Sequence, residues 1–301
     1  MTPRWSPNPR SLYSRAELLA WGVHPRRLAS REFHEAVPGF FTPSAAPASL
    51  ELAARTLQQK AVPGAVISHA SAAEMLGLPL PRHLEYATSR TVHCSVPTVR
   101  RRRSGHGAIM HTTADDHPAS RIRGVRLSAP VTMLRELAGM LDHTQLVACC
   151  DHLVGPASRV RPRLSLADLR QLVHEATAGY RINDVRAAVR DSRERVESPK
   201  ETETRLLLRE AGFAEPVVNL TVRAPGTGET FRLDLSYPEQ RLAIEYDGFW
   251  HSTDRRRHRR DRRKDDVLHE LSWNVVRLAD ADLESPGMFL GRIAHLGAPR
   301  T

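Results

Sequence analysis

Two neighbouring segments, 231–235 and 242–246, most constrain how this 301-residue chain can fold. In each of them apolar and polar residues alternate with a period of two, which predicts a half-buried β-strand. The residues between them have turn chemistry, so the two strands are expected to pair as a hairpin. That pairing would bring Asp234, Glu245 and Asp247 together on one face of the sheet.

These three carboxylates would repel one another, which is a poor way to stabilise a sheet. A divalent cation among them removes the difficulty, because hard cations such as Mg²⁺ take oxygen ligands. The simpler alternative is that the acids are solvated and pair with nearby arginines. The register of the acids, followed by Gly248 and His251, favours a metal site at Asp234, Glu245 and Asp247.

The Glu-x-Asp-Gly…His pattern of residues 245–251 resembles the endonuclease-like domains related to very-short-patch-repair endonucleases, which belong to the PD-(D/E)xK nuclease superfamily. The similarity continues through 261–278, and Glu203 matches a glutamate on the first helix of the family. It covers roughly the last third of the chain. The resemblance implies an α/β, restriction-endonuclease-like C-terminal domain at 198–301, with a mixed sheet flanked by helices in the order α-β-β-β-α-β.

The resemblance also implies phosphodiester hydrolysis with Mg²⁺ or Mn²⁺ as the cofactor. Asp234 and Glu245 would be the primary metal ligands, and Glu203 would help to position a second metal or its water. His251 would act as an acid or base near the scissile phosphate. The chain departs from the superfamily at Asp247, which stands where a lysine is usual, so the role of that third position is open.

The N-terminal segment has the pattern of a small winged helix-turn-helix. Ser14 and Glu17 form a potential capping box that predicts a helix through Trp21. A second helix is expected over 24–35, followed by a short strand or wing at 37–43.

This segment resembles the N-terminal domain of abortive-infection-type antitoxins, which are winged-helix repressors. The residues that carry the resemblance are 18–23, 26–28 and 37–41. The resemblance implies α+β structure and contacts with DNA, although a solvated helix face explains the same arginines equally well. The expected contact residues are Arg26, Arg27 and Arg31.

These patterns divide the chain into a winged-helix region, an antitoxin-like α+β middle domain, a helical connector and the endonuclease-like domain. The corresponding ranges are 1–48, 49–155, 156–197 and 198–301.

Histidines in the middle region do not match a familiar metal-binding or nucleophile motif. His69 is expected to start a helix and to have a packing role. His111 and His117 lie near Asp115 and Asp116, but their spacing fits no usual zinc pattern. A loop is therefore expected there.

The formal net charge of +10 and the pI of about 10.3 suit a polyanionic partner, and we expect DNA. Composition bias from a GC-rich genome is the alternative origin of this charge. The arginine run near 100–103 and the basic helix near 254–271 are plausible phosphate contacts. The expected residues are Arg101, Arg102, Arg256, Arg260, Arg263 and Lys264.

The three cysteines, Cys94, Cys149 and Cys150, form neither a disulfide framework nor a metal-binding pair. A reducing cytoplasm fits this usage. No secretion signal or membrane-spanning segment is expected.

Two functions follow from these expectations. The first is a metal-dependent DNA endonuclease that an N-terminal DNA-binding module targets. The second is a non-catalytic DNA-binding regulator, antitoxin-like, whose nuclease-like domain only binds DNA. The intact set of Glu203, Asp234, Glu245 and His251 favours the first. A structure in which these side chains diverge, or form salt bridges with the basic helix, would favour the second.

Overall fold

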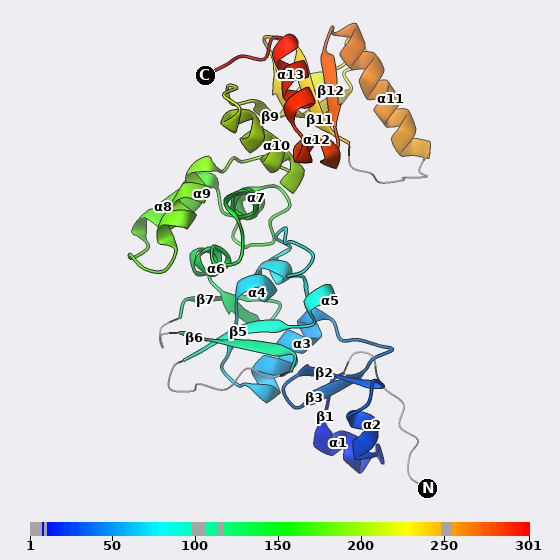
Figure 1. The fold of residues 1–301 in the computed structure, drawn as a ribbon, viewed down its shortest axis with the longest axis vertical. Coiled ribbons are helices and arrows are strands. Elements are labelled where there is room, and N and C mark those ends of the chain that lie inside the picture. Colours follow the sequence, from blue (N-terminus) through cyan, green and yellow to red (C-terminus); the bar gives the residue numbers. More distant parts are fainter. Residues whose placement is uncertain (1–7, 9–10, 98–105, 114–116, 248–254) are drawn as a thin grey trace.

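The computed structural model describes residue 8 and residues 11–97, 106–113, 117–247 and 255–301. The chain is a mixed α/β protein in which three sheets follow one another along the long axis (Figure 1). No helix in these ranges has both the length and the apolar character needed to cross a bilayer.

The N-terminal sheet has the order β1-β3-β2. The capping box of Ser14 and Glu17 is present as predicted, and the first helix follows it. The second helix is much shorter than the predicted 24–35, because Ser30 Oγ bonds to the carbonyl of Arg27 and the chain turns into a strand. The elements are β1 (Tyr13–Ser14), α1 (Arg15–Ala20), α2 (Pro25–Leu28), β2 (Phe33–Val37) and β3 (Phe40–Pro43).

The middle sheet has the order β6-β5-β4-β8-β7 and is mixed, since β5 pairs with β6 in parallel and with β4 in antiparallel. His111 lies in strand β6, not in the loop expected from its sequence. The elements are α3 (Leu50–Thr56), the π-helical turn η1 (Leu57–Ala61), β4 (Val66–Ile67), α4 (His69–Leu76), α5 (Tyr86–Ser89), β5 (Val92–Pro97), β6 (Ala108–Thr113), β7 (Ala119–Ile122), β8 (Val125–Ser128), α6 (Pro130–Leu137) and α7 (His143–Val154).

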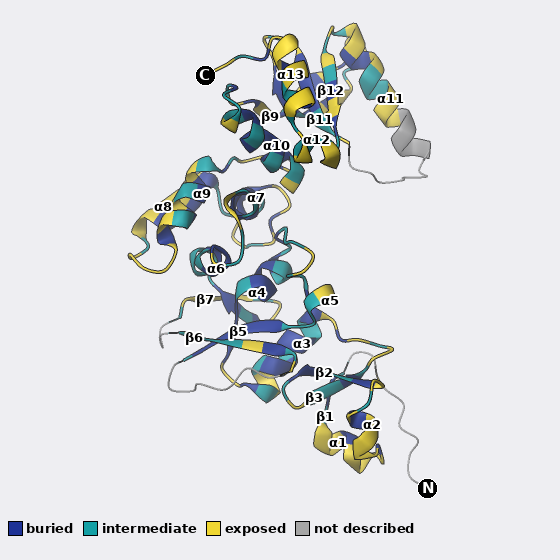
Figure 2. Cartoon of the chain, viewed as in Figure 1, coloured by how far each residue is buried: buried dark blue, intermediate teal, exposed yellow. Residues whose placement is uncertain are grey.

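Helices α8 (Leu166–Glu175) and α9 (Ile182–Asp191) continue the core of the middle sheet. Leu169 and Val185, which are completely buried, belong to the same hydrophobic cluster as Ile67 of β4. The predicted connector therefore packs on the middle region, with its polar side toward solvent (Figure 2).

The C-terminal sheet has the order β12-β11-β10-β9, with β11 and β12 parallel and the other pairs antiparallel. The predicted order α-β-β-β-α-β is present, and two further helices follow it. Helices α10 and α13 pack on one face of the sheet and α11 on the other. The elements are α10 (Pro199–Glu210), β9 (Val217–Arg223), β10 (Thr230–Tyr237), β11 (Leu242–Tyr246), α11 (Arg255–Glu270), β12 (Asn274–Leu278), α12 (Asp280–Glu284) and α13 (Gly287–His295).

Strand β10 does not keep one apolar face along its length. Leu233 packs with Leu268 of α11, whereas Leu235 packs with Leu208 of α10. Asp234 lies at this change of face, opposite Asn219, whose φ of +50° is left-handed. A left-handed residue turns the strand locally, and this accounts for the break in a strict two-residue pattern.

Candidate functional site

Asp234 and Glu245 lie at the end of the β10–β11 pairing. The register pairs Leu235 with Ile244, and the next residue on each strand is one of the two acids. Asp234 Oδ2 accepts a hydrogen bond from the backbone N–H of Tyr246 at 3.1 Å. The side chain of Asp234 therefore turns toward the strand that carries Glu245, and the predicted convergence of these two acids is confirmed.

Lys264 of helix α11 reaches the same carboxylate pair. Its Nζ donates to Glu245 Oε2 at 2.5 Å, with the Lys264 side chain 19% and the Glu245 side chain 15% exposed. The other oxygen, Glu245 Oε1, is buried and has no hydrogen-bond partner among the described residues. A buried carboxylate oxygen without a partner is costly, so Oε1 offers an open coordination position.

Glu201 of helix α10 is the third acid of this site and is only 5% exposed. Its Oε2 accepts hydrogen bonds from Asn219 Nδ2 at 2.8 Å and from the backbone N–H of Glu197 at 3.0 Å. Burial, reinforced by the negative charge of Asp234, raises the pKa of Glu201 to about 7. Glu201 and Asp234 thus interact electrostatically although they lie on different elements.

The other two acids also resist ionisation. Burial raises the pKa of Asp234, and the Tyr246 N–H and Lys264 partly offset the effect. Burial also raises the pKa of Glu245, with Lys264 opposing and Asp234 reinforcing the shift. Three desolvated carboxyl groups with raised pKa values are characteristic of functional sites, and a bound cation would relieve their repulsion.

The remaining residues predicted for this site lie elsewhere. Glu203 is 39% exposed at its side chain and pairs with Lys200 at 2.9 Å. Asp247 is exposed just past the end of β11, and its backbone N–H donates to the carbonyl of Leu278. His251 falls outside the described residues. The structure therefore brings Glu201, not Glu203, into electrostatic contact with Asp234.

Helical periodicity in the sequence could have shown that Glu201, and not Glu203, lies on the buried face of its helix. Glu201, Arg205 and Leu208 follow the i, i+4, i+7 spacing of one helix face and are all buried. Glu203 is two residues from Glu201, so its side chain points to nearly the opposite side. Asn219 carried no sequence signal, because its role depends on a left-handed residue within a strand.

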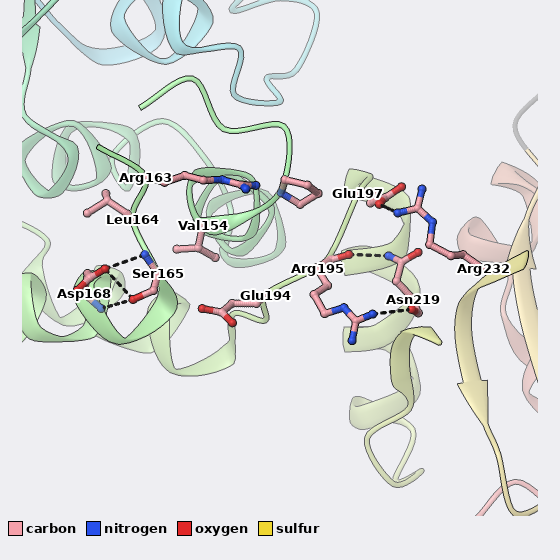
Figure 3. A pocket seen from close by; sticks show the side chains of 11 residues that line it. Val154, Arg163, Leu164, Ser165, Asp168, Glu194, Arg195, Glu197, Asn219 and Arg232 are labelled. Atoms are coloured by element: carbon pink, nitrogen blue, oxygen red, sulfur yellow. Dashed lines mark hydrogen bonds and ion pairs between the residues drawn. The ribbon is translucent and has the colours of Figure 1, made fainter. Parts of the chain in front are cut away.

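A pocket of about 450 Å³ is lined by residues of the 154–168 and 194–197 segments and by Asn219 and Arg232 of the C-terminal sheet (Figure 3). Asn219, which holds Glu201, lines this pocket together with Arg163, Arg195 and Arg232. Arg195 and Asn219 bond to each other's backbone carbonyls, and Arg232 pairs with Glu197. The link between this pocket and the buried acids is Asn219, which lines the pocket and donates to Glu201.

The predicted nucleic-acid contacts that the structure describes lie in two groups, one on and just after α2 and one on α11. Arg26 and Arg27 lie on α2 and Arg31 in the turn after it, all exposed. On α11, Arg260 is exposed and Arg263 pairs loosely with Glu229 at 3.5 Å. Lys264 instead faces the acids. The structure gives no description of Arg101, Arg102 or the side chain of Arg256.

No protein-family model matches the chain, and no solved structure matches it. Two uncharacterized proteins of Mycobacterium tuberculosis are similar, MT2308 of strain CDC 1551 / Oshkosh and Rv2248 of strain ATCC 25618 / H37Rv. Each is 28% identical over 212 residues, which cover 69% of this chain and 75% of the relative. Neither name states an activity, so the similarity assigns none to this chain.

Proposed function

We propose that the protein is a metal-dependent DNA endonuclease whose site is formed by Asp234, Glu245, Glu201 and Lys264. One observation carries the proposal: desolvated acids meet at a strand end, and one oxygen of Glu245 is buried without a described partner. An arrangement that only stabilised the fold would gain more from apolar side chains there.

The donor set fits Mg²⁺ or Mn²⁺. Asp234 and Glu245 supply carboxylate oxygens, which hard cations prefer, and Glu245 Oε1 is available as a ligand. When bound, such a cation lowers the pKa of water and neutralises charge on a phosphate group. Both effects suit phosphodiester hydrolysis.

The residues of the chain itself have separate roles in this proposal. Lys264 provides an ammonium group at the acids, whereas the superfamily usually has its lysine at the position that Asp247 occupies here. Its positive charge would stabilise the negative charge that develops on a phosphate. Glu201, with a pKa of about 7, can take up or release a proton near neutral pH, and Asn219 orients it.

Binding of DNA would use arginines of the pocket that Asn219 lines and of helix α11. Arg163, Arg195 and Arg232 line this pocket, and Arg260 is exposed on α11. These guanidinium groups suit a sugar-phosphate backbone, and the net charge of +10 adds long-range attraction.

A second candidate is a DNA-binding regulator without catalysis. The Lys264–Glu245 ion pair favours it, because an ammonium at 2.5 Å already compensates the acid that a metal would need. The two candidates differ in whether a divalent cation can bind beside this ion pair.

The test is nicking of supercoiled plasmid and single-stranded DNA with Mg²⁺ or Mn²⁺, comparing the parent protein with Glu245→Ala. Glu239→Ala is the matched control, since Glu239 is exposed in the turn between the same strands. We expect cleavage by the parent and the control, and a loss of at least about 100-fold in Glu245→Ala. Cleavage by none of the proteins, with salt-sensitive DNA binding in all three, would establish the regulator instead.

A further inference from the structure

Three histidines that are far apart in the sequence meet on one face of the middle sheet. His93 lies on β5 and His111 on the parallel strand β6, where His111 pairs in register with Ser95. Residues two apart on a strand share a face, so His93 lies on the same face as His111. His69, the first residue of α4, packs against this face, with its ring stacked on that of His111.

The three rings form a compact group. The rings of His69 and His111 stack with centroids 3.5 Å apart, and those of His93 and His111 are 5.3 Å apart. His93 Nδ1 and His111 Nε2 lie 3.1 Å from each other. One ligand nitrogen from each of the three histidines can be chosen so that all lie within 4.8 Å of one another.

We propose that His69, His93 and His111 bind a transition-metal ion of the Zn²⁺ class, at a site separate from the carboxylates of the C-terminal sheet. Imidazole nitrogens are ligands for such ions, and three of them leave a position open for water or a further ligand. Ligands held roughly 2.0–2.1 Å from tetrahedral zinc lie about 3.3–3.4 Å apart. His93 Nδ1 and His111 Nε2 are hydrogen-bonded at 3.1 Å, close to that spacing, and the ion would replace this hydrogen bond.

The surroundings keep these rings in the neutral, ligating form. Burial and the neighbouring histidines lower the pKa of His69 to about 3 and that of His93 to about 4, and burial lowers the pKa of His111. Ligation requires a neutral imidazole, so protons compete little with a metal here at neutral pH.

Glu136 of α6 forms hydrogen bonds that fix His69 and the neighbouring Ser128. Its Oε2 accepts the backbone N–H of His69 at 2.9 Å, and its Oε1 accepts from Ser128 Oγ at 3.1 Å. His69 has a left-handed φ of +52°, which is uncommon for a residue with a side chain. The bond to Glu136 holds this conformation, and strain maintained in this way is typical of binding sites.

A nucleophilic triad does not explain the same residues. A triad histidine uses its two ring nitrogens for two different partners. Here Ser68 Oγ lies 3.0 Å and Glu136 Oε2 3.9 Å from the same atom, His69 Nδ1. Ser68 is also completely buried, so a substrate has no access to it.

The test uses the full chain, stripped of metal by a chelator and titrated with Zn²⁺ and Co²⁺. We expect one Zn²⁺ with a dissociation constant of about 1 µM or below, and visible absorption bands of Co²⁺ in a low-symmetry nitrogen site. His93→Asn and His111→Phe should each weaken Zn²⁺ binding at least about 100-fold, and the phenylalanine keeps a flat ring against His69. His83→Asn, at an exposed histidine, and Glu245→Ala should leave this binding unchanged.

X-ray absorption of the Zn²⁺-bound parent protein identifies the metal ligands directly. This test therefore does not require the histidine variants to fold. Scattering from imidazole rings with nitrogen at roughly 2.0–2.1 Å supports the site. Oxygen ligation alone, Zn²⁺ binding that survives both histidine substitutions, or the absence of tight Zn²⁺ binding would each overturn the proposal. Loss of Zn²⁺ binding in Glu245→Ala would move the ion to the carboxylate site.

Discussion

The Nζ of Lys264 lies 2.5 Å from Glu245 Oε2, so a basic residue of helix α11 is bound to an acid of strand β11. Charge-assisted bonds of this length are strong, and this one lies where both side chains are largely buried. Any cation that binds to Glu245 must share the carboxylate with Lys264 or displace it. Lys264 therefore links metal binding to catalysis in the proposed site.

Lys264→Met should separate these two effects. We expect Mg²⁺ to bind at least as tightly as in the parent, because the competing ammonium is gone, while DNA cleavage falls about 100-fold or more. Calorimetric titration of Mg²⁺ and the plasmid-nicking rate measure the two effects. Lys60→Met is the control, since Lys60 lies in the turn η1 of the middle region. Weaker Mg²⁺ binding in Lys264→Met would contradict this assignment.

Glu201 should make the protein less stable as the pH rises. Its pKa is raised from 4.5 to about 7 by burial, so the folded state binds a proton that the unfolded state has released. The stabilisation that comes from the proton bound to Glu201 in the folded state is complete below about pH 4.5 and is lost as the pH rises through 7. The difference is on the order of 3 kcal/mol. Glu201→Gln, which stays neutral, should therefore be more stable than the parent at pH 8 and similar to it near pH 4.5.

Urea unfolding at both pH values, in the presence of a chelator, measures this difference. The chelator matters because a bound cation would lower the pKa of the acids. Glu203→Gln provides the control, since Glu203 is partly exposed and paired with Lys200. An equal gain for Glu201→Gln at both pH values would show that the effect is not due to titration.

The sequence predicted the C-terminal elements well because their patterns are local. The hairpin of β10 and β11 was evident from alternation and turn chemistry, and it brought Asp234 and Glu245 together as expected. The alternation did not predict that Leu233 and Leu235 would enter different cores. That change depends on the left-handed Asn219 of the neighbouring strand, which no single-strand pattern contains.

The parts that were missed depend on contacts between distant segments. His69, His93 and His111 are separated by more than a dozen residues each, and only the parallel pairing of β5 with β6 aligns two of them. The sequence spacing around His111 and His117 had suggested a loop instead. The end of α2 at Leu28 was missed for a different, local reason: a serine turn competes with helix continuation, although the apolar spacing would have allowed a longer helix.

The N-terminal arginines should contribute to DNA affinity through charge. Arg26→Gln and Arg31→Gln should each reduce the salt dependence of DNA binding by about one unit in the slope of log K against log salt. Arg27→Gln should have a smaller effect, because Arg27 is paired with Glu32 at 2.6 Å. Fluorescence anisotropy over a range of salt concentrations measures the slopes. Identical slopes for all three variants and the parent would exclude this surface from the interface.

A buried ion pair should hold the C-terminal sheet to the middle region. Arg205 of α10 and Asp151 of α7 are 0% and 1% exposed at their side chains, and the closest atoms are 3.4 Å apart. Arg205 also donates to the carbonyl of Asp191 at 2.8 Å. Arg205→Met would leave Asp151 buried without its guanidinium partner, so we expect a loss of about 3–5 kcal/mol in the free energy of unfolding.

Urea unfolding of Arg205→Met against the parent measures this loss. Arg277→Met is the matched control, because Arg277 pairs with Asp265 while its side chain is 49% exposed, and exposed pairs contribute at most about 1 kcal/mol. Asp151 also accepts bonds from Thr202 Oγ1 and the backbone N–H of Arg193, and these keep it ordered in the variant. A loss in Arg205→Met no larger than in Arg277→Met would mean that these two bonds alone satisfy the buried carboxylate.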